Sequence, residues 1–453
     1  MAANDTICAI VSALGEAAVG IIRLSGEDCY EIADKCFRGK APLKEAPTHS
    51  INYGKIIDAQ GKIIDEVLAM VMRAPRSFTG ENVVEIQCHG GMLVMEKLLA
   101  RILACGARLA ERGEFSKRAF LNGKMDLTQA ESIMDIISAT NNRGLEMAIG
   151  QRFGGLRKEI ELLRADLVEL IAFMQADIDY PEDDIERLTN EEFSERIEHL
   201  LEELDKLKAG YTEGRIYREG LQVVLAGKPN VGKSSLLNAL LKEERAIVTP
   251  IAGTTRDTIS EYVVLKGVPL KIVDTAGIRE TSDEIEQMGV ARSLKSLESA
   301  DLVLYLLEKG TQLDQEDREN LALIGEKPLI FVANKADLAK EEADLSLYGD
   351  VVSISALTGQ GLDELAGKIK EKFIKSETDF SAQGAINNVR HLNSVEKARE
   401  FLQNCLDGFA LELPYDLLVI DLQNAWEELG TISGETVEED LLDIIFSKFC
   451  LGK

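Results

Sequence analysis

The sequence has little cysteine, and none of it follows a recognisable pattern. Its seven cysteines are an odd number, and no two of them are separated by two residues. Neither a disulfide framework nor a zinc knuckle is indicated, and reduced thiols fit better. The start, MAANDTICAI, lacks a basic segment ahead of an apolar run, and no stretch approaches about 18 uninterrupted apolar residues. We therefore expect a cytoplasmic chain that spans no membrane.

Positive charge is also scarce. The chain carries 51 Lys and Arg against 78 Asp and Glu, a formal net charge of −27. This balance argues against a basic arm or a general nucleic-acid cradle, so a nucleic-acid partner needs separate support. Hydrophobic residues are plentiful enough to build cores. The chain has 453 residues, 45% of them hydrophobic, which predicts a globular protein of roughly two to four domains.

The pattern changes three times along the chain, which predicts a multidomain protein with α/β and α parts. Residues 1–120 mix short apolar runs with Gly-rich turns, as in an α+β domain. Residues 121–216 are helical in period, residues 217–376 alternate strands with helices, and residues 377–453 are helical again. The simplest interpretation is an α/β module inserted into a helical domain made from both flanks, although separate helical domains would give the same pattern.

The helical segments carry signals for their starts and buried faces. Thr128 and Glu131 have capping-box spacing, and so do Thr436 and Glu439 before the last helix. Apolar stripes are expected at Leu156, Ile160, Leu163, Leu167, Leu170 and Met174, and at Val437, Leu441, Ile444 and Ile445. Gly452 suits the left-handed turn that closes a helix, which would direct Lys453 back toward its neighbours.

The α/β module contains a strong phosphate-binding motif. An apolar strand is followed by Gly227-x4-Gly232-Lys233-Ser234 and then by a helix. In this arrangement backbone N–H groups and a helix N-terminus bind phosphate, Lys233 supplies a mobile positive charge, and the Ser234 hydroxyl binds Mg²⁺. The alternative, a Gly-rich turn that binds nothing, does not account for the strand, the spacing, the Lys-Ser pair and the helix together.

Two further motifs predict the base. PLIFVANKAD ends a buried strand with Asn334-Lys335-x-Asp337, and a carboxylate there accepts from the N1–H and 2-amino groups of guanine, which adenine lacks. Ser355-Ala356 follows another strand, where a backbone N–H meets guanine O6. With the P-loop and DTAG (274–277), these motifs predict a guanine site and resemble the translation-factor-related GTPase superfamily.

Hydrolysis must differ from that of signalling GTPases, which place a water-orienting glutamine after DxxG. Here that position is Ile278, which cannot hold a water, and Glu286 is our candidate for orienting it. Asn230 and the segment TPIAGTTRD (249–257) offer oxygens that suit potassium beside the phosphates. The residues alone leave open the alternative that Asn230 is a turn former and 249–257 a switch loop.

Motifs outside the module extend the resemblance to the whole chain. SFTGENVVEIQCHGG, GEFSKRAFLNGKMDLTQAE, DIDYPEDDI and the terminal CLGK, in this order around the GTPase motifs, resemble the tRNA-modification GTPase MnmE/TrmE family. The resemblance implies a folate-binding N-terminal domain, a helical domain from two flanking segments, an inserted Ras-like G domain, and a homodimer formed through the N-terminal domain. With the flavoprotein MnmG (GidA), in a heterotetramer, the family installs aminomethyl-type groups such as carboxymethylaminomethyl at C5 of the wobble uridine of certain tRNAs, using 5,10-methylene- or 5-formyl-tetrahydrofolate.

The resemblance also assigns residues. Arg23, Glu85, Lys124 and Lys453 match folate-contacting positions, Ser234 and Thr255 match Mg²⁺ ligands, and Asn230, Thr249, Ile251 and Thr254 match a potassium loop. Lys233, Glu286 and Cys450 match catalytic positions. The implied nucleotide contacts are Asn230, Val231, Gly232, Lys233, Ser234, Ser235, Thr249, Pro250, Ile251, Ala252, Gly253, Thr254, Thr255, Asp274, Thr275, Ala276, Gly277, Asn334, Lys335, Asp337, Ser355 and Ala356.

The last candidate is Cys450, close to the chain end. A nearby Lys453 would favour the nucleophilic thiolate. Filling a helix end is the commoner role of a lone cysteine. The match to a terminal Cys-x-Gly-Lys implies a part in the modification chemistry, either as nucleophile or as positioning group.

Two other classes of GTPase compete with this interpretation. A ribosome-assembly GTPase would be a binding module with a similar G domain, but it needs neither the folate set nor the terminal cysteine. A regulatory GTPase driven by exchange factors fits poorly with Ile278 and the potassium loop, which favour self-activation by dimerisation. The sequence therefore predicts a potassium-activated GTPase of tRNA modification that converts GTP to GDP and phosphate.

Overall fold

The computed structural model describes residues 5–180, 188–243, 260–274, 297–338, 349–374, 384–437, 439–450 and 452. The chain divides into two compact units. The first unit is Met1–Met134, Ile160–Val168 and Trp426–Lys453, and the second is Asp135–Glu159 and Glu169–Ala425. In the described part of the chain, no helix is both long and apolar enough to cross a membrane.

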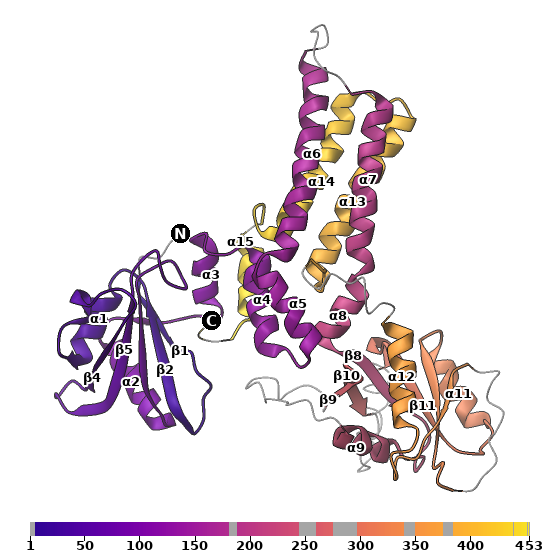
Figure 1. Ribbon diagram of the computed structural model, residues 1–453, viewed down its shortest axis with the longest axis horizontal. Helices are drawn as coiled ribbons and strands as arrows, with labels where there is room; N and C mark the ends of the chain where they lie inside the picture. The colour runs from indigo at the N-terminus through magenta and orange to yellow at the C-terminus, as the bar shows by residue number, and fades with distance from the viewer. Residues whose placement is uncertain are drawn as a thin grey trace, which may run out of the picture. The chain divides into compact units, whose positions relative to one another are not determined.

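A seven-stranded sheet forms the N-terminal part of the first unit (Figure 1). Its strands are β1 (Ile7–Ile10), β2 (Ala17–Ser25), β3 (Phe37–Gly39), β4 (Ser50–Ile57), β5 (Ile63–Met72), β6 (Val83–Gly90) and β7 (Arg108–Leu109). They lie in the order β3-β4-β5-β6-β2-β1-β7, and the neighbouring pairs are antiparallel except for β1 with β7. The sheet and its helices confirm the mixed α and β content predicted for this region.

One face of this sheet is covered by helices. In β5 the buried Val67, Ala69 and Val71 alternate with more exposed neighbours, as in a strand with one covered face. Helices α1 (Cys29–Cys36) and α2 (Met92–Ala104) contribute to the same apolar core as these strands and contact each other. A 3-10 turn, η1 (Leu43–Glu45), packs against α1.

A second apolar cluster of the first unit lies among α3 (Glu114–Leu121), α4 (Leu127–Ser138) and α15 (Glu439–Ser447). From α15 and the residues after it, the buried members are Leu442, Ile445, Phe446 and Phe449, at the i, i+3, i+4, i+7 spacing of one helix face. Ile444, which was expected on this face, is 57% exposed, so that prediction was wrong.

The capping pair predicted for α4 was also wrong. The helix begins after Asp126, whose Oδ1 accepts from the Gln129 N–H at 2.9 Å while Gln129 Oε1 accepts from the Asp126 N–H at 3.0 Å. This reciprocal pair replaces the one expected at Thr128 and Glu131, and Thr128 donates its hydroxyl to Asp126 instead. Spacing alone does not separate overlapping candidates two residues apart.

The capping box expected at Thr436 does not form either. α15 begins at Glu439, and the Thr436 hydroxyl donates to the carbonyl of Glu427 at 2.9 Å. Because the helix begins only at Glu439, Thr436 does not occupy its N-cap position.

Gly452, close to the end of the chain, packs against β1. Gly452 has a φ of 92°, in the left-handed region that favours glycine. A Cβ at this position would overlap the Ile10 carbonyl oxygen, so the backbone approaches the strand closely. The Gly113 N–H also donates to the Cys450 carbonyl at 3.5 Å. The predictions of a left-handed Gly452 and of a chain end that is held in place are confirmed.

The long helices are α6 (Gly155–Asp179), α7 (Asn190–Ala209), α13 (Val389–Ala410) and α14 (Tyr415–Ser433) (Figure 1). α7 packs along α13, where the Phe193 ring stacks on Phe409 with centroids 5.7 Å apart. Tyr415 meets both rings edge-on and donates to Asn190 at 2.6 Å. The stripe predicted on α6, from Leu156 to Met174, is buried, which confirms its helical period.

A six-stranded sheet forms the α/β module of the second unit, in the order β13-β12-β11-β8-β10-β9. Its strands are β8 (Leu221–Ala226), β9 (Ser260–Leu265), β10 (Val268–Asp274), β11 (Leu302–Glu308), β12 (Leu329–Asn334) and β13 (Val351–Ser353). The pairs are parallel except β9 with β10. Helices α9 (Lys233–Glu243) and α12 (Leu362–Phe373) share a core with one face, and α11 (Gln315–Ile324) with the other. This is a doubly wound α/β sheet, and it confirms the alternation of strands and helices predicted for this segment.

The chain enters this module through α8 (Tyr211–Glu219) and returns through residues 384–388. Both connections are held by α5 (Asn142–Arg152) and the residue before it. Asn141 donates to the Tyr217 carbonyl at 2.7 Å, and Gln151 donates to the Ala385 carbonyl at 3.0 Å. The two ends of the module are therefore fixed to one helix.

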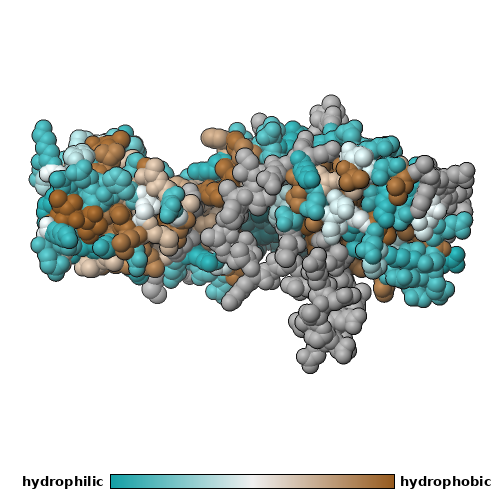
Figure 2. All heavy atoms as spheres, turned by 90° about the horizontal axis from the view of Figure 1, so that it is seen from below, coloured by the Kyte–Doolittle hydropathy of each residue, from teal (hydrophilic) through white to brown (hydrophobic). Residues whose placement is uncertain are grey.

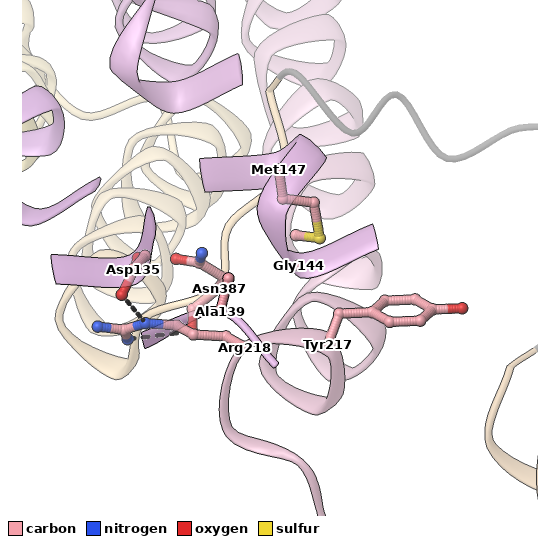
Figure 3. Close-up of a pocket in the computed structure, with 7 residues that line it drawn as sticks. All are labelled: Asp135, Ala139, Gly144, Met147, Tyr217, Arg218 and Asn387. Carbon is pink, nitrogen blue, oxygen red and sulfur yellow. Dashed lines mark hydrogen bonds and ion pairs between the residues drawn. The ribbon is translucent and has the colours of Figure 1, made fainter. Parts of the chain in front are cut away.

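An ion pair completes this junction (Figure 3). Arg218 Nε donates to Asp135 Oδ1 at 2.7 Å, and its Nη1 donates to the Asn387 carbonyl at 3.4 Å. Figure 3 shows Asp135 and Arg218 meeting beside a small hollow that Met147 and Asn387 also line. Asp135 lies in the last turn of α4, which ends at Ser138, so one arginine joins that turn, the entry helix α8 and the return segment.

Candidate functional site

The predicted nucleotide motifs meet at one edge of the parallel sheet. The P-loop follows β8, Asn334 ends β12, and Ser355 follows β13. The last residue of β10, Asp274, pairs with Leu225 near the end of β8. Ligands of doubly wound sheets bind outside the carboxyl ends of the strands, so this edge is the candidate nucleotide site.

The P-loop backbone has conformations that its residues permit. Gly227 has a φ of 127° and Gly232 a φ of 101°. A Cβ at Gly227 would overlap the Leu306 carbonyl oxygen, so only glycine lets the loop lie this close to β11. Asn230 is left-handed with a φ of 65°, which asparagine tolerates better than most residues. This agrees with Asn230 as a turn former, and its potassium role stays a prediction.

Lys233 lies over the loop that it is expected to serve. Its Nζ donates to the Gly227 carbonyl at 2.6 Å and to the Lys228 carbonyl at 2.8 Å. Lys233 also begins α9, so Ser234 is in the first helical turn, where backbone N–H groups have no partner inside the helix. This places a positive charge and a helix N-terminus together, as a phosphate site requires.

Asn334 ties the P-loop to the base-binding loops. Its side chain is 2% exposed, its Nδ2 donates to the Val231 carbonyl at 2.8 Å, and its Oδ1 accepts from the Ala356 N–H at 3.0 Å. A Cβ at Gly232 would overlap Asn334 Nδ2, so the contact also requires a glycine in the P-loop. The structure thus brings three separately predicted motifs together through one amide.

The residues predicted to bind guanine are in contact with one another. Ser355 Oγ donates to Asp337 Oδ1 at 2.7 Å, which orients the carboxylate. Lys335 is left-handed with a φ of 66°, and its Nζ forms an ion pair with Glu308 at 2.9 Å. The Asn-Lys-x-Asp loop and the loop after β13 are therefore held in place by side chains at the same edge of the sheet.

Some predicted residues lie outside the described part of the chain. They are Thr249, Pro250, Ile251, Ala252, Gly253, Thr254, Thr255, Thr275, Ala276, Gly277, Glu286 and Lys453. The potassium loop, the second Mg²⁺ ligand, the water-orienting acid and the fourth folate residue therefore stay predictions from the sequence.

A second candidate site lies in the N-terminal sheet. Arg23 of β2 and Glu85 of β6 are register partners, and Arg23 Nε donates to Glu85 Oε1 at 2.7 Å. The Arg23 guanidinium also lies 5.1 Å from the Phe78 ring centroid and 5.5 Å from that of Phe115. The structure thus brings together two of the four predicted folate residues, as a charged pair backed by aromatic rings.

Lys124 contacts the loop that carries Phe78. Its Nζ donates to the Pro75 carbonyl at 3.0 Å, and its side chain would meet a Cβ at Gly80. The loop between β5 and β6 therefore touches both Arg23 and Lys124, although the two cations are more than one hundred positions apart in the sequence.

Cys450 differs from the other six cysteines in its exposure. Those six are buried, whereas Cys450 is partly exposed. Burial raises the pKa of the Cys8 and Cys405 thiols to about 12 and that of Cys88 to about 11, so these thiols stay protonated near neutral pH.

Sequence reasoning missed two sets of contacts at these sites. The first is the pair of rings beneath Arg23, because nothing in the sequence relates Phe115 to strand β2. The second is a contact between P-loop residue Lys228 and Asp317 of α11, with Nζ 3.0 Å from Oδ2. A lysine inside GKPNVGKS was the available signal, but its partner is far along the chain.

A doubly wound sheet with a P-loop after β8 and a guanine-type Asn-Lys-x-Asp loop at the same edge defines a P-loop GTPase. Residues 6–124 match the family described as GTP-binding protein TrmE N-terminus, and residues 127–450 match the MnmE helical domain. The chain is 45% identical over 456 residues to the tRNA modification GTPase MnmE of Bacillus cereus and 46% identical over 458 residues to that of Geobacillus thermodenitrificans. These alignments cover 99% of this chain and 99% of each relative. The chain therefore belongs to the MnmE family of tRNA modification GTPases and is a GTP hydrolase.

Among solved structures, Era of Aquifex aeolicus bound to GDP and AlF4⁻ is 31% identical with a TM-score of 0.28, over 40% of this chain and 66% of Era.

Proposed function

We propose that this protein is a potassium-activated GTPase that acts with the flavoprotein MnmG to install an aminomethyl-type group at C5 of the wobble uridine of certain tRNAs. A tetrahydrofolate, in its 5,10-methylene or 5-formyl form, supplies the one-carbon unit. Membership of the MnmE family supports tRNA as the substrate. The observation that carries the folate part of the proposal is the Arg23–Glu85 pair on a sheet against which Gly452 is packed.

The geometry of the first unit supports this folate role. β1 pairs with β2, and the register aligns Ala9 with Arg23 and Ile10 with Ile22. Gly452 packs on Ile10, so the chain end reaches the strand beside the one that carries Arg23. A carboxylate such as Glu85 accepts from the donors of a pterin, while arginine and lysine bind the carboxylates of the folate tail. Cys450 precedes this contact by two residues and is a partly exposed thiol.

The second unit supplies the GTPase. Ser234 follows Lys233 in the first turn of α9, which suits a serine that binds Mg²⁺. Asn230, left-handed at the turn of the P-loop, would give its side-chain oxygen to a potassium ion together with Thr249, Ile251 and Thr254. Potassium there would offset charge in the transition state, and Glu286 would orient the water in place of the missing glutamine.

The homodimer of this proposal would form through the N-terminal domain. Ile51 and Tyr53 of β4, Ile63 of β5, and Met92 and Leu93 of α2 are all more than half exposed. Figure 2 shows hydrophobic side chains gathered over this domain, at the left of the view. Apolar surface of this kind on a soluble fold marks interaction sites. We place the protein in the cytoplasm, as a heterotetramer with MnmG.

Binding of 5-formyl-tetrahydrofolate to the full-length protein tests the proposal. Glu85→Gln keeps the shape of the side chain and removes its charge, so affinity should fall roughly tenfold. Glu66→Gln is the control, because Glu66 lies on the neighbouring strand β5 and forms an exposed pair with Lys55 of β4. GTP hydrolysis should be unchanged in both. If Glu85→Gln binds the folate as tightly as Glu66→Gln, the folate role of this pair is wrong.

A further inference from the structure

A buried carboxylate lies behind the P-loop. Asp317, in the first turn of α11, is 0% exposed. Its Oδ1 accepts from the Tyr305 hydroxyl at 2.9 Å, and its Oδ2 accepts from the Asp314 N–H at 3.2 Å. Burying a carboxylate is costly unless a cation pairs with it. Lys228 provides that cation, with its Nζ 3.0 Å from Asp317 Oδ2.

Lys228 connects this carboxylate to the phosphate site. It directly follows Gly227, the first glycine of the P-loop, and its side chain points to α11 while its backbone belongs to the loop. The Lys228 carbonyl accepts from Lys233 Nζ, as the Gly227 carbonyl also does. A shift of the Lys228 backbone would therefore displace an oxygen that holds the phosphate-binding lysine.

We infer that Asp317 is a positioning residue of the GTPase site: through the side chain of Lys228 it fixes the start of the P-loop and so the place of Lys233. Asp317 touches neither nucleotide nor Mg²⁺ in this scheme. It acts because β11, which carries Tyr305, and α11 together hold its carboxylate rigidly, with the Tyr305 ring packed edge-on against Phe331 at 5.8 Å. Preorganised support of this kind keeps a binding loop in its productive geometry.

A purely structural role for Asp317 is the rival explanation. Asp314 and Asp317 form a capping box at the start of α11, so on this explanation each residue matters only because it starts the helix. The structure separates the two roles, because Asp314 contacts the same lysine but its side chain is 61% exposed. An exposed ion pair contributes little, whereas loss of charge at the buried Asp317 leaves Lys228 without its fixed partner.

The test is the affinity of the full-length protein for fluorescent GDP and the KM for GTP. Asp317→Asn keeps the acceptor for Tyr305 and removes the charge, and it should weaken GDP binding roughly tenfold. Lys228→Met should weaken it equally, and Lys228→Arg, which keeps the cation, should restore most of the affinity. Asp314→Asn should bind GDP like the wild type, because asparagine is as good an N-cap as aspartate. The double variant Lys228→Met/Asp317→Asn should be no weaker than either single variant.

Three results would overturn the inference. One is wild-type affinity in Asp317→Asn. Another is equal weakening in Asp314→Asn and Asp317→Asn, which would assign both residues to helix capping. The third is equal weakening in Lys228→Arg and Lys228→Met, which would make the charge irrelevant. If Asp317→Asn does not fold, the GDP affinities of Lys228→Arg and Lys228→Met still test the inference. The Lys228 side chain is partly exposed, so we expect both of these variants to fold.

Discussion

At the scale of single residues, a few side chains hold the nucleotide site together. Asn334 donates to the P-loop and accepts from the loop after β13, and Ser355 donates to Asp337. These contacts join motifs that lie far apart in the sequence. The P-loop was recognisable from its own spacing, whereas the base-binding motifs were interpreted from their place after the P-loop.

Asp337 should decide between guanine and xanthine. Asp337→Asn keeps an oxygen that accepts from Ser355, but its amide presents a donor where guanine also donates, so the preference should turn from GTP toward xanthosine triphosphate. The measurement is the KM for each nucleotide. Asp363→Asn, in an exposed pair with Lys266, is the control and should leave both values unchanged. Unchanged GTP affinity in Asp337→Asn would remove Asp337 from the site.

Cys450 should matter for modification and not for folding. Cys450→Ser nearly keeps the size of the side chain, so the thermal transition and the GTPase rate should stay at wild-type values while tRNA modification is lost. Cys405→Ser is a useful comparison, because that thiol is buried and burial raises its pKa to about 12. Normal modification by Cys450→Ser would show that the thiol only fills space.

Contacts that depend on tertiary structure were not predictable at this scale. The Phe78 and Phe115 rings beneath Arg23, and Asp317 behind Lys228, come from segments with no fixed spacing to their partners. From the sequence, Arg23 and Glu85 were related only because both match folate-contacting positions of the family. The register of β2 with β6 brings the two side chains into contact.

At the scale of elements, helix periods were predicted well and helix ends poorly. The apolar stripe on α6 is buried as expected. An apolar residue every three or four positions over a long segment fits only one face of an α-helix. The capping pair of α4 was misassigned because the acidic and hydroxyl residues of that stretch offer overlapping pairs, and Asp126 with Gln129 forms the actual one. Ile444 was misassigned because the last helix has apolar residues on more than one face.

The junction around Arg218 should be important for the stability of the second unit. Arg218→Met removes a cation from Asp135, whose side chain is 8% exposed, and should lower the free energy of unfolding by about 2–4 kcal/mol. The shift of the thermal transition measures this effect. Arg143→Met, which breaks the more exposed pair with Glu146 on α5, should cost under about 1 kcal/mol. Equal effects of the two substitutions would show that the Arg218 pair does not stabilise the junction.

At the scale of the whole molecule, the chain combines a GTPase module with an N-terminal sheet to which the far end of the chain returns. Gly452 lies on β1, so the C-terminal residues belong to the same unit as Arg23 and Glu85. An α/β module within the helical part of the chain was predictable from the changes in pattern, whereas the boundaries at 120, 216 and 376 remain predictions. The net charge of −27 gave no sign of an RNA substrate, which family membership supports.

The central claim, that this GTPase serves tRNA modification, is tested most directly by nucleoside mass spectrometry of tRNA from cells that lack the protein. We predict loss of the C5-modified wobble uridine, restored by the wild-type gene and not by Lys233→Ala, since Lys233 is the phosphate-binding lysine of the P-loop. Fully modified tRNA in the deletion strain, together with an accumulation of immature ribosomal subunits, would contradict the account and favour a ribosome-assembly GTPase.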